Sequence, residues 1–290
     1  MKTAALLLPL LSLALLAGCG ETEEPPKPKV ASESAAPAGY LEKIKARDKL
    51  IVGVFTDKPP FGFVDESGRY VGFDTDIGRR FAKDLLGDEN KVEFVAVEPA
   101  SRIPFLQSDK VDLILANMTV TPERKEAVEF TNPNLKVAVQ ALVPQGSSVK
   151  KLDDLATRTT IVTTGTTADI WLTKNHPDWK LLKFEKNSES LQALANGRGD
   201  AYAQDNLVLF SWAKQNPGYR VLEEKLGAEA PIAPAVKKGN LELRDWVNSE
   251  LAELGEEKYL LKLYDQYVRK ELSDDTKPES VIVEGGKWQG

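Results

Sequence analysis

Strand-like and helix-like segments alternate twice along this chain, and this rhythm limits the possible folds more than any other feature of the sequence. The strand-like runs are short and apolar, and they fall at residues 49–55, 91–97, 111–116, 137–143, 159–163, 181–184 and 200–204. Helical patterns separate them at residues 74–86, 101–107, 167–175 and 188–196. A βαβαβ order predicts a mostly parallel sheet with helices on both faces. Because the order occurs twice, we expect an α/β protein with two lobes.

The last third of the chain follows a different pattern. After an apolar run at residues 231–236, two helical patterns carry apolar residues every three or four positions, at about residues 243–254 and 259–267. Such stripes are typical of helices that pack on a core, and we interpret them in this way rather than as a cofactor site. The chain without its N-terminal segment is long enough for two modest lobes or one large domain.

The N-terminal 18 residues have the layout of a secretory signal peptide. Lys2 precedes an apolar run of about 14 residues, which is too short for a membrane-spanning helix. The run closes with Leu16-Ala17-Gly18-Cys19, which resembles the lipobox of bacterial lipoproteins. This resemblance implies that residues 1–18 are removed and that Cys19 becomes the lipidated first residue. Residues 19–39 are rich in Glu, Pro, Lys, Ser and Ala, so we expect a flexible stalk.

The composition argues against several classes of protein. The formal net charge of -6 leaves no basic stripe that would suit a nucleic acid. Cys19 is the only cysteine, so no intramolecular disulfide can form. His176 is the only histidine, which argues against a multi-histidine metal site and against a nucleophile–histidine pair. We therefore expect no metal, no cofactor and no nucleic-acid partner.

One candidate binding residue follows the strand-like run at 111–116. In open α/β sheets, ligands bind beyond the carboxyl ends of the strands. Here Thr121 and Pro122 predict the start of a helix that places Arg124 in its first turn. A guanidinium matches a carboxylate through two parallel hydrogen bonds. The alternative, equally compatible with the spacing, is a surface arginine paired with a neighbouring glutamate.

Two further strand ends carry polar groups. Thr164-Gly165-Thr166-Thr167 follows the run at 159–163 and opens a helix, whose free N–H groups suit an anion. Asp205 follows the run at 200–204, where it can bind an ammonium group or cap the helix that starts at Asn206. An arginine, an anion-binding helix start and a carboxylate are together complementary to a zwitterion. A free α-amino acid satisfies all three.

Several stretches of the chain match known sequence motifs. They are GFD at 72–74, RIPFLQS at 102–108, KVDLI at 110–114, TVTPER at 119–124 and FTNP at 130–133. From about residue 41 to about residue 269 the chain resembles the family 3 solute-binding proteins of amino-acid ABC transporters. Further stretches resemble the cysteine-binding lipoproteins within that family, and these are VFTDKPPFG at 54–62, GTTAD at 165–169, RGDA at 198–201, PIAPAVKKG at 231–239 and VEGGK at 283–287.

The resemblance implies a two-lobed periplasmic-binding-protein fold of type II, with a ligand cleft between lobes that are joined by two hinge strands. Lobe 1 is then discontinuous, with residues 40–137 and 231–290, and lobe 2 comprises residues 138–230. Residues 138–143 and 230–233 match the two crossings between the lobes. We expect the lobes to close on the ligand like a hinged jaw.

The family's contacts to the ligand's α-carboxylate carry over onto three positions of this sequence. Arg124 falls where family members clamp this group, and Thr119 and the amide of Thr167 fall where they add donors. Thr166 belongs to the same helix start. No catalytic residue is expected, because this resemblance is to binding proteins.

The other carried-over contacts concern the α-ammonium and the side chain of the ligand. Asp205, helped by the Asn117 carbonyl, falls where the ammonium is received. Phe55 and Lys58 lie in the loop where many members place an aromatic ring over the ligand, and either of them is a candidate to face the side chain. Arg102 matches the arginine with which glutamate- or aspartate-binding members hold the distal carboxylate, yet the cysteine-binding members carry it too.

We therefore expect a lipid-anchored, monomeric amino-acid receptor of the cell envelope that delivers its ligand to an ABC permease in the inner membrane. Cysteine is the leading candidate ligand, and glutamate or aspartate is the alternative. An enzyme related to cyclohexadienyl or arogenate dehydratase is an alternative of another class, and a binder that serves a chemoreceptor is a third. The run at 281–283 is expected to pack back on lobe 1 rather than to contact a partner.

Overall fold

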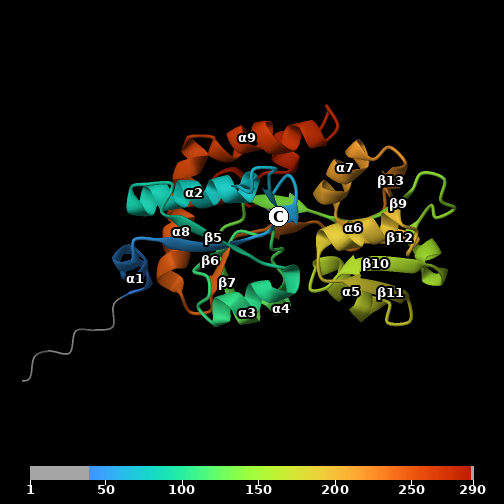
Figure 1. The fold of residues 1–290 in the computed structure, drawn as a ribbon, viewed down its shortest axis with the longest axis horizontal. Helices are drawn as coiled ribbons and strands as arrows, with labels where there is room; N and C mark the ends of the chain where they lie inside the picture. Colours follow the sequence, from blue (N-terminus) through green and yellow to red (C-terminus); the bar gives the residue numbers. More distant parts are fainter. Residues whose placement is uncertain (1–38, 289–290) are drawn as a thin grey trace, which may run out of the picture. The chain divides into compact units, whose positions relative to one another are not determined.

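The computed structural model describes residues 39–288 of the chain. The predicted signal peptide, the lipidation site Cys19 and the stalk up to residue 38 lie outside the described residues. Within residues 39–288, no helix combines the length and the apolar character needed to cross a membrane. Two five-stranded sheets organise this part of the chain, and Figure 1 shows them in its two halves.

The first sheet, sheet 1, has the strand order β5-β1-β6-β15-β7. Its strands are β1 (Leu50–Val54), β5 (Val92–Ala96), β6 (Leu113–Ile114), β7 (Val128–Phe130) and β15 (Ala235–Lys237). The helices and small strands around it are α1 (Tyr40–Arg47), α2 (Phe73–Leu86), α3 (Arg102–Gln107), α4 (Pro122–Ala127), β2 (Asp57–Lys58), β3 (Gly62–Val64) and β4 (Tyr70–Val71). We call this group lobe 1, together with the C-terminal helices.

The second sheet, sheet 2, has the order β11-β10-β12-β9-β13 and forms lobe 2 with its helices. Its strands are β9 (Val139–Pro144), β10 (Thr159–Thr163), β11 (Lys180–Phe184), β12 (Ala201–Asp205) and β13 (Tyr219–Val221). Its helices are α5 (Thr167–Asn175), α6 (Asn187–Ala195) and α7 (Asn206–Gln215). All of these elements but β13, which was not predicted, match the predicted segments closely, and the two-lobed α/β fold is confirmed.

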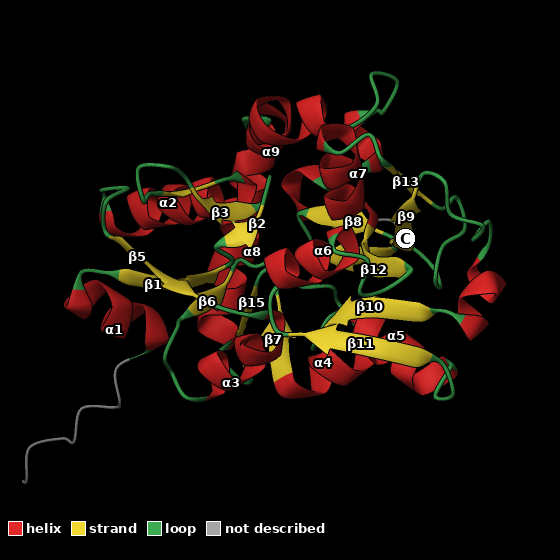
Figure 2. Ribbon diagram, turned by 45° about the vertical axis from the view of Figure 1, so that its right-hand side comes forward, coloured by secondary structure: helices red, strands yellow, loops and turns green. Residues whose placement is uncertain are grey.

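Helices cover both faces of sheet 2, as predicted (Figure 2). Successive side chains of a strand point to opposite faces, so each strand packs against helices on both sides. On β10, Val162 packs in a cluster with Ala168 and Leu172 of α5. Its neighbour Ile161 packs in another cluster, with Leu194 of α6 and Leu209 of α7. The two clusters lie on opposite faces of the strand.

The prediction of mostly parallel sheets is wrong for half of each sheet. The pairs β5–β1–β6 and β11–β10–β12 are parallel, but β15 and β9 run antiparallel to their neighbours. In register, Val139 at the start of β9 pairs with Asp205 at the end of β12, and Ala235 at the start of β15 pairs with Ile114 at the end of β6. Each antiparallel strand enters its sheet directly from the other lobe, next to the carboxyl end of a parallel strand. It therefore runs in the opposite direction to that parallel strand.

The crossings between the lobes form a short antiparallel ribbon. It consists of β8 (Leu135–Val137) and β14 (Ala230–Ile232), and Ala230 pairs with Val137. The predicted strand at 137–143 is thus broken at Ala138. Residues 139–143, predicted to belong to the first crossing, lie within sheet 2, because the chain has already left the ribbon at that point.

The C-terminal helices complete lobe 1. They are α8 (Leu241–Glu256) and α9 (Tyr259–Leu263), and α9 continues as a π-helical turn over Tyr264–Val268. Their apolar stripes join the largest hydrophobic cluster with α1, α2 and β1, which confirms the predicted core packing. The end of the chain then packs against β8, as predicted: the Lys136 amide donates to Val281 O over 2.9 Å, and the Val283 amide donates to Asn134 O over 2.9 Å.

Candidate ligand-binding site

A small cavity lies between the two lobes, where several strands of both sheets end. Its volume is about 10 Å³, which is room for about one water molecule. The nine side chains predicted from the sequence and the resemblance all line it, and they are Phe55, Lys58, Arg102, Asn117, Thr119, Arg124, Thr166, Thr167 and Asp205. Pro99 and Gln204 line it as well, and the sequence analysis missed both.

Arg124 is held by the start of α4. The Thr121 hydroxyl caps this helix by accepting from the Arg124 amide over 3.2 Å, and Pro122 follows the cap as predicted. The Arg124 side chain is only 5% exposed, and it donates to Thr119 O over 2.8 Å and to Gly165 O over 3.0 Å. Both bonds go to carbonyls.

The alternative for Arg124, a surface arginine paired with a neighbouring glutamate, is wrong. Within residues 39–288, no carboxylate lies within ion-pair distance of its guanidinium, and Glu123 instead faces Lys174 at 3.4 Å. Burial lowers the pKa of Arg124 to about 10, and the charges of Asp205 and Glu123 partly oppose this effect. The guanidinium of Arg124 therefore remains a cation at neutral pH and can bind a carboxylate.

The start of α5 approaches Arg124 from the other lobe. Thr166 caps the helix by accepting from the Asp169 amide over 3.3 Å, and its hydroxyl donates to Thr163 O over 2.7 Å. Its hydroxyl is thus engaged within the turn, whereas the Thr167 hydroxyl lies 3.5 Å from Arg124 Nη1. The helix start and the arginine face the same space.

Asp205 ends β12 on the opposite side of the cavity. It is 3% exposed, and its Oδ2 accepts from Lys58 Nζ over 3.1 Å and from Asn117 Nδ2 over 2.8 Å. The side chain makes no capping bond to α7, so the alternative role as a helix cap is wrong. Lys58 and Asn117 of lobe 1 therefore both donate hydrogen bonds to one carboxylate of lobe 2.

Asn117 has a left-handed backbone, with φ of 46°, which asparagine tolerates better than most residues. Its amide donates to Asp74 Oδ2 over 3.2 Å, and its carbonyl accepts from Arg102 over 3.3 Å. Its side-chain Oδ1 is buried without a hydrogen-bond partner among the described residues. The side chain of Asn117 contacts Asp205, and the predicted role of its carbonyl toward the ligand's ammonium stays a prediction.

Phe55 lies between two buried cations. Lys58 Nζ lies 5.2 Å from the centroid of its ring, and Arg102 Cζ lies 5.5 Å from it. Arg102 is 3% exposed and donates to Pro99 O over 3.0 Å and to Ala116 O over 2.9 Å. Phe55 and Lys58 both line the cavity, so each stays a candidate to face the side chain of the ligand.

Gln204 supports Asp205 from behind. Its Oε1 accepts from the Asp205 amide over 2.9 Å, and its Nε2 donates to Asn187 Oδ1 over 2.8 Å and to the Tyr202 hydroxyl over 3.0 Å. Asn187 Nδ2 in turn lies 3.3 Å from Asp57 Oδ1 in lobe 1. A polar residue inside an otherwise apolar strand was the signal in the sequence that could have identified Gln204.

Acidic groups gather at the edge of the cleft. Glu98 of lobe 1 has a buried Oε2 without a hydrogen-bond partner among the described residues. Burial, followed by the charge of Asp57, raises the pKa of Glu98 to about 7; Glu185 and Glu189 of lobe 2 add to this effect, and Lys186 opposes it. The negative charge of Glu98 is therefore unfavourable in the folded protein.

Replacing Glu98 with glutamine is expected to stabilise the protein above about pH 7 and to have little effect near pH 4.5. The folded protein keeps the Glu98 proton up to about pH 7, whereas the unfolded chain loses it near pH 4.5. This group therefore makes the free energy of unfolding fall as the pH rises from about 4.5 to about 7. Thermal unfolding at both pH values measures the effect. Glu66→Gln changes an exposed carboxylate and is the control. A Glu98→Gln effect that is equal at both pH values contradicts the prediction.

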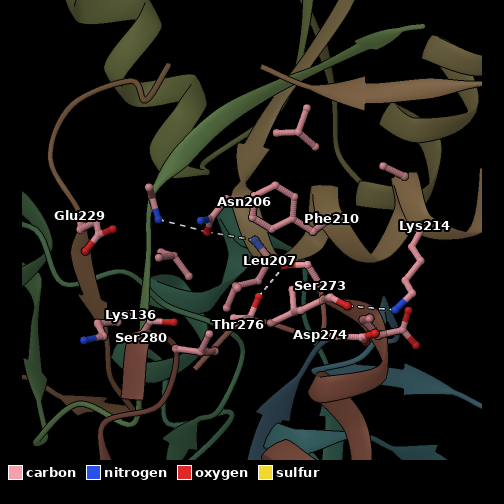
Figure 3. Close-up of a pocket in the computed structure, with 17 residues that line it drawn as sticks. Lys136, Asn206, Leu207, Phe210, Lys214, Glu229, Ser273, Asp274, Thr276 and Ser280 are labelled. Atoms are coloured by element: carbon pink, nitrogen blue, oxygen red, sulfur yellow. Dashed lines mark hydrogen bonds between the residues drawn. The ribbon is translucent and has the colours of Figure 1, made fainter. Parts of the chain in front are cut away.

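A larger cavity of about 680 Å³ lies between β8, α7 and the C-terminal segment (Figure 3). At its edge, Lys214 Nζ donates to Leu272 O over 2.9 Å, and Asn206 Oδ1 accepts from the Ala138 amide over 3.2 Å. Its charged residues are exposed, as Lys214 and Asp274 are, or partly exposed, as Lys136 and Glu271 are. We favour the smaller cavity as the ligand site, because buried charges of both signs converge there.

Three comparisons with known proteins agree on one family. The sequence model of the bacterial extracellular solute-binding proteins, family 3, matches residues 50–270. A glutamine-binding protein of Geobacillus stearothermophilus is 40% identical over 228 residues, which is 77% of this chain and 87% of that protein. A solved cysteine-binding protein from Campylobacter jejuni is 45% identical, with a TM-score of 0.84 over 85% of this chain and 100% of that chain. A solved L-cysteine receptor of Neisseria gonorrhoeae is 46% identical, with a TM-score of 0.82 over 84% of this chain and 99% of that chain.

Proposed function

This chain belongs to family 3 of the bacterial extracellular solute-binding proteins, and from that premise we propose that its ligand is free L-cysteine, bound in the cavity between the lobes. The chain is an amino-acid-binding component of an ABC transporter that acts outside the cytoplasm. The relatives named above are binding proteins, and the chain is a binding protein rather than an enzyme.

One observation carries the proposal of an amino-acid site: a buried guanidinium and a buried carboxylate from different lobes line one cavity. In our proposal Arg124 binds the α-carboxylate of the ligand, together with the start of α5. Asp205 binds the α-ammonium, and the unpartnered Oδ1 of Asn117 is a second acceptor for the same group. Thr119 and Thr167 complete the carboxylate side.

The energetics of such a site require no covalent step. Micromolar binding corresponds to about 8 kcal/mol. A charge-assisted hydrogen bond in a dry cleft contributes roughly 1.5–3 kcal/mol net, so five or six of them suffice after the entropy of association is subtracted.

The choice of cysteine is supported by the 45–46% identity to the two solved cysteine-binding proteins over more than four fifths of the chain. Glutamate or aspartate remains the second candidate. The observation that favours an acidic ligand is the pair of buried cations, Lys58 and Arg102, which face the cavity beside Phe55.

We also propose that the lobes part to admit the ligand and close over it. In this proposal we keep the predicted boundaries, which assign residues 40–137 and 231–290 to lobe 1 and residues 138–230 to lobe 2. The cavity of about 10 Å³ is too small for an amino acid, so the lobes or the side chains around it must move. The ribbon of β8 and β14 is the proposed hinge.

Replacing Gly165 with alanine tests the closure. Gly165 has φ of 77°, and an added Cβ would lie 2.8 Å from Ala100 Cα in the other lobe. We expect cysteine to bind about 5-fold to 150-fold more weakly, because overpacking at such a contact costs about 1–3 kcal/mol. Gly197→Ala is the matched control in lobe 2, since its φ is 68° and nothing lies within 4 Å of the added atom. If calorimetry gives both variants the same affinity for cysteine, the approach of Gly165 to Ala100 plays no part in the closure.

The anchor is a separate proposal that rests on the lipobox-like sequence. Cys19 becomes the lipidated first residue of the mature chain and holds the protein at the cell envelope, where it passes its ligand to a permease of the inner membrane. Fractionation of cells that express Cys19→Ser tests this, because the variant is expected to leave the membrane fraction. Retention at the membrane would contradict it.

A thermal-shift panel of the free amino acids, run in reductant, tests the ligand, with cystine assayed separately without reductant. Ligands that bind the folded state raise the unfolding temperature by mass action. We expect the largest shift with L-cysteine. A shift with glutamate or aspartate alone identifies the second candidate, and the absence of any shift contradicts an amino-acid site.

A further inference from the structure

We propose that the cavity binds its amino acid with the side chain as an anion, so that cysteine is bound as the thiolate. This inference rests on the function proposed above and adds the charge state of the ligand. It follows from the balance of buried charges around the cavity and from the position of one lysine.

The buried cations outnumber the buried carboxylates at this site. Lys58, Arg102 and Arg124 are 2%, 3% and 5% exposed, and they face the carboxylates of Asp205 and, behind Asn117, of Asp74, which are 3% and 1% exposed. Glu123, the other acidic group near Arg124, is 62% exposed in its side chain and faces Lys174. A buried cation without a counter-ion is unfavourable, so the site lacks negative charge.

The pKa shifts of the buried groups agree with this shortage of negative charge. Burial lowers the pKa of Lys58, and the charge of Arg102 lowers it further, against the opposing charges of Asp205 and Asp74. Burial and then the charge of Arg124 lower the pKa of Arg102. Burial raises the pKa of Asp74 to about 6, so this second carboxylate is itself incompletely charged just below neutral pH.

The contact between Lys58 and Asp205 shows where the extra negative charge must lie. Lys58 Nζ lies 3.1 Å from Asp205 Oδ2, at the group that we propose for the ligand's ammonium. When the ligand's ammonium binds Asp205, two cations share the single negative charge of this carboxylate, and Lys58 remains buried. The ligand's α-carboxylate pairs with Arg124, so only the ligand's side chain is left to balance Lys58 and Arg102.

Cysteine meets this requirement through its thiol. A free thiol has a pKa of about 8.5, close enough to neutrality for neighbouring cations to ionise it. On binding, the S–H bond breaks heterolytically, the electron pair stays on sulfur, and the proton passes to the buffer. No oxidant takes part. Serine has a similar shape, but its hydroxyl does not ionise in this pH range, so the site selects cysteine by charge.

The test measures the affinities of cysteine, serine and aspartate by calorimetry between about pH 6 and pH 8, in reductant. One proton released on binding makes the affinity rise tenfold per pH unit below the pKa of the free thiol. We expect the ratio of cysteine to serine affinity to rise about 100-fold over this range. The ratio of aspartate to serine affinity should stay constant. Aspartate carries its side-chain charge throughout this range, so its ratio to serine reports any response of the protein's own titrating groups, including Asp74 and Glu98, to an anionic side chain.

Two further measurements report the thiolate directly. The heat of cysteine binding should change with the ionisation heat of the buffer, as one released proton requires, and the ultraviolet absorbance of a thiolate should appear on titration near neutral pH. Lys58→Met should lower the ratio of cysteine to serine affinity, because the thiolate loses a neighbouring cation. Lys225→Met, which alters an exposed lysine paired with Glu229, is the matched control.

The outcomes separate this inference from the proposed function. If cysteine binds but its ratio to serine does not change with pH, the thiolate is excluded while the amino-acid site stands. If aspartate binds and cysteine does not, the thiolate is equally excluded. If no amino acid binds, the function proposed above fails, and this inference fails with it.

Discussion

Replacing Arg124 with alanine is expected to weaken cysteine binding by about 3–5 kcal/mol, or more than about 100-fold in the dissociation constant, because the ligand's α-carboxylate then lies buried without its partner. Arg124 is 5% exposed, and its guanidinium is held in place by hydrogen bonds to Thr119 O and Gly165 O. Calorimetry with cysteine in reductant measures the loss.

Two further variants control this experiment. Arg124→Lys keeps the charge but loses the planar fork, so it should fall between the wild type and Arg124→Ala. Arg158→Ala removes an exposed arginine outside the cavity and should bind cysteine as the wild type does. Circular dichroism checks that each variant is folded. A folded Arg124→Ala variant with an unchanged dissociation constant would remove Arg124 from the site.

Asp205→Asn is expected to have an effect of similar size from the other side of the cavity. The change keeps the shape of the side chain but removes the negative charge that we propose for the ligand's ammonium. We expect an affinity loss of about 3 kcal/mol or more and a lower unfolding temperature, because Lys58 Nζ, 3.1 Å from Asp205 Oδ2, is left buried without a counter-ion.

A double variant separates the two consequences of Asp205→Asn. Adding Lys58→Met removes the unpaired cation, so the unfolding temperature should recover while cysteine binding stays weak. If binding recovers together with stability, Asp205 acts through the fold and not through the ligand.

The regular elements of lobe 2 were predictable from local signals. The strand at 159–163 and the helix at 167–175 have the predicted bounds, because a β-branched run ends at a glycine turn and a threonine caps the helix that follows. The strand predicted at 111–116 is only Leu113–Ile114 in the structure. Its flanks are apolar because they are buried, and burial alone does not distinguish a strand from an extended loop.

The candidate site was predictable only in part. Arg124 and Asp205 could be identified because they follow strand-like runs, and this is a property of the local sequence. Lys58 and Arg102 were suggested by resemblance alone, since their burial depends on lobes that are distant in sequence. No local pattern indicates that Lys58 reaches Asp205 from 147 positions away in the sequence.

The ribbon of β8 and β14 has a mechanical consequence. Two strands joined side by side by backbone hydrogen bonds resist sliding past each other, but they bend readily across their flat face. The last segment of the chain backs this ribbon, through the bond from the Lys136 amide to Val281 O. In the closure that we propose, we therefore expect the lobes to move by bending across this ribbon rather than by sliding along it.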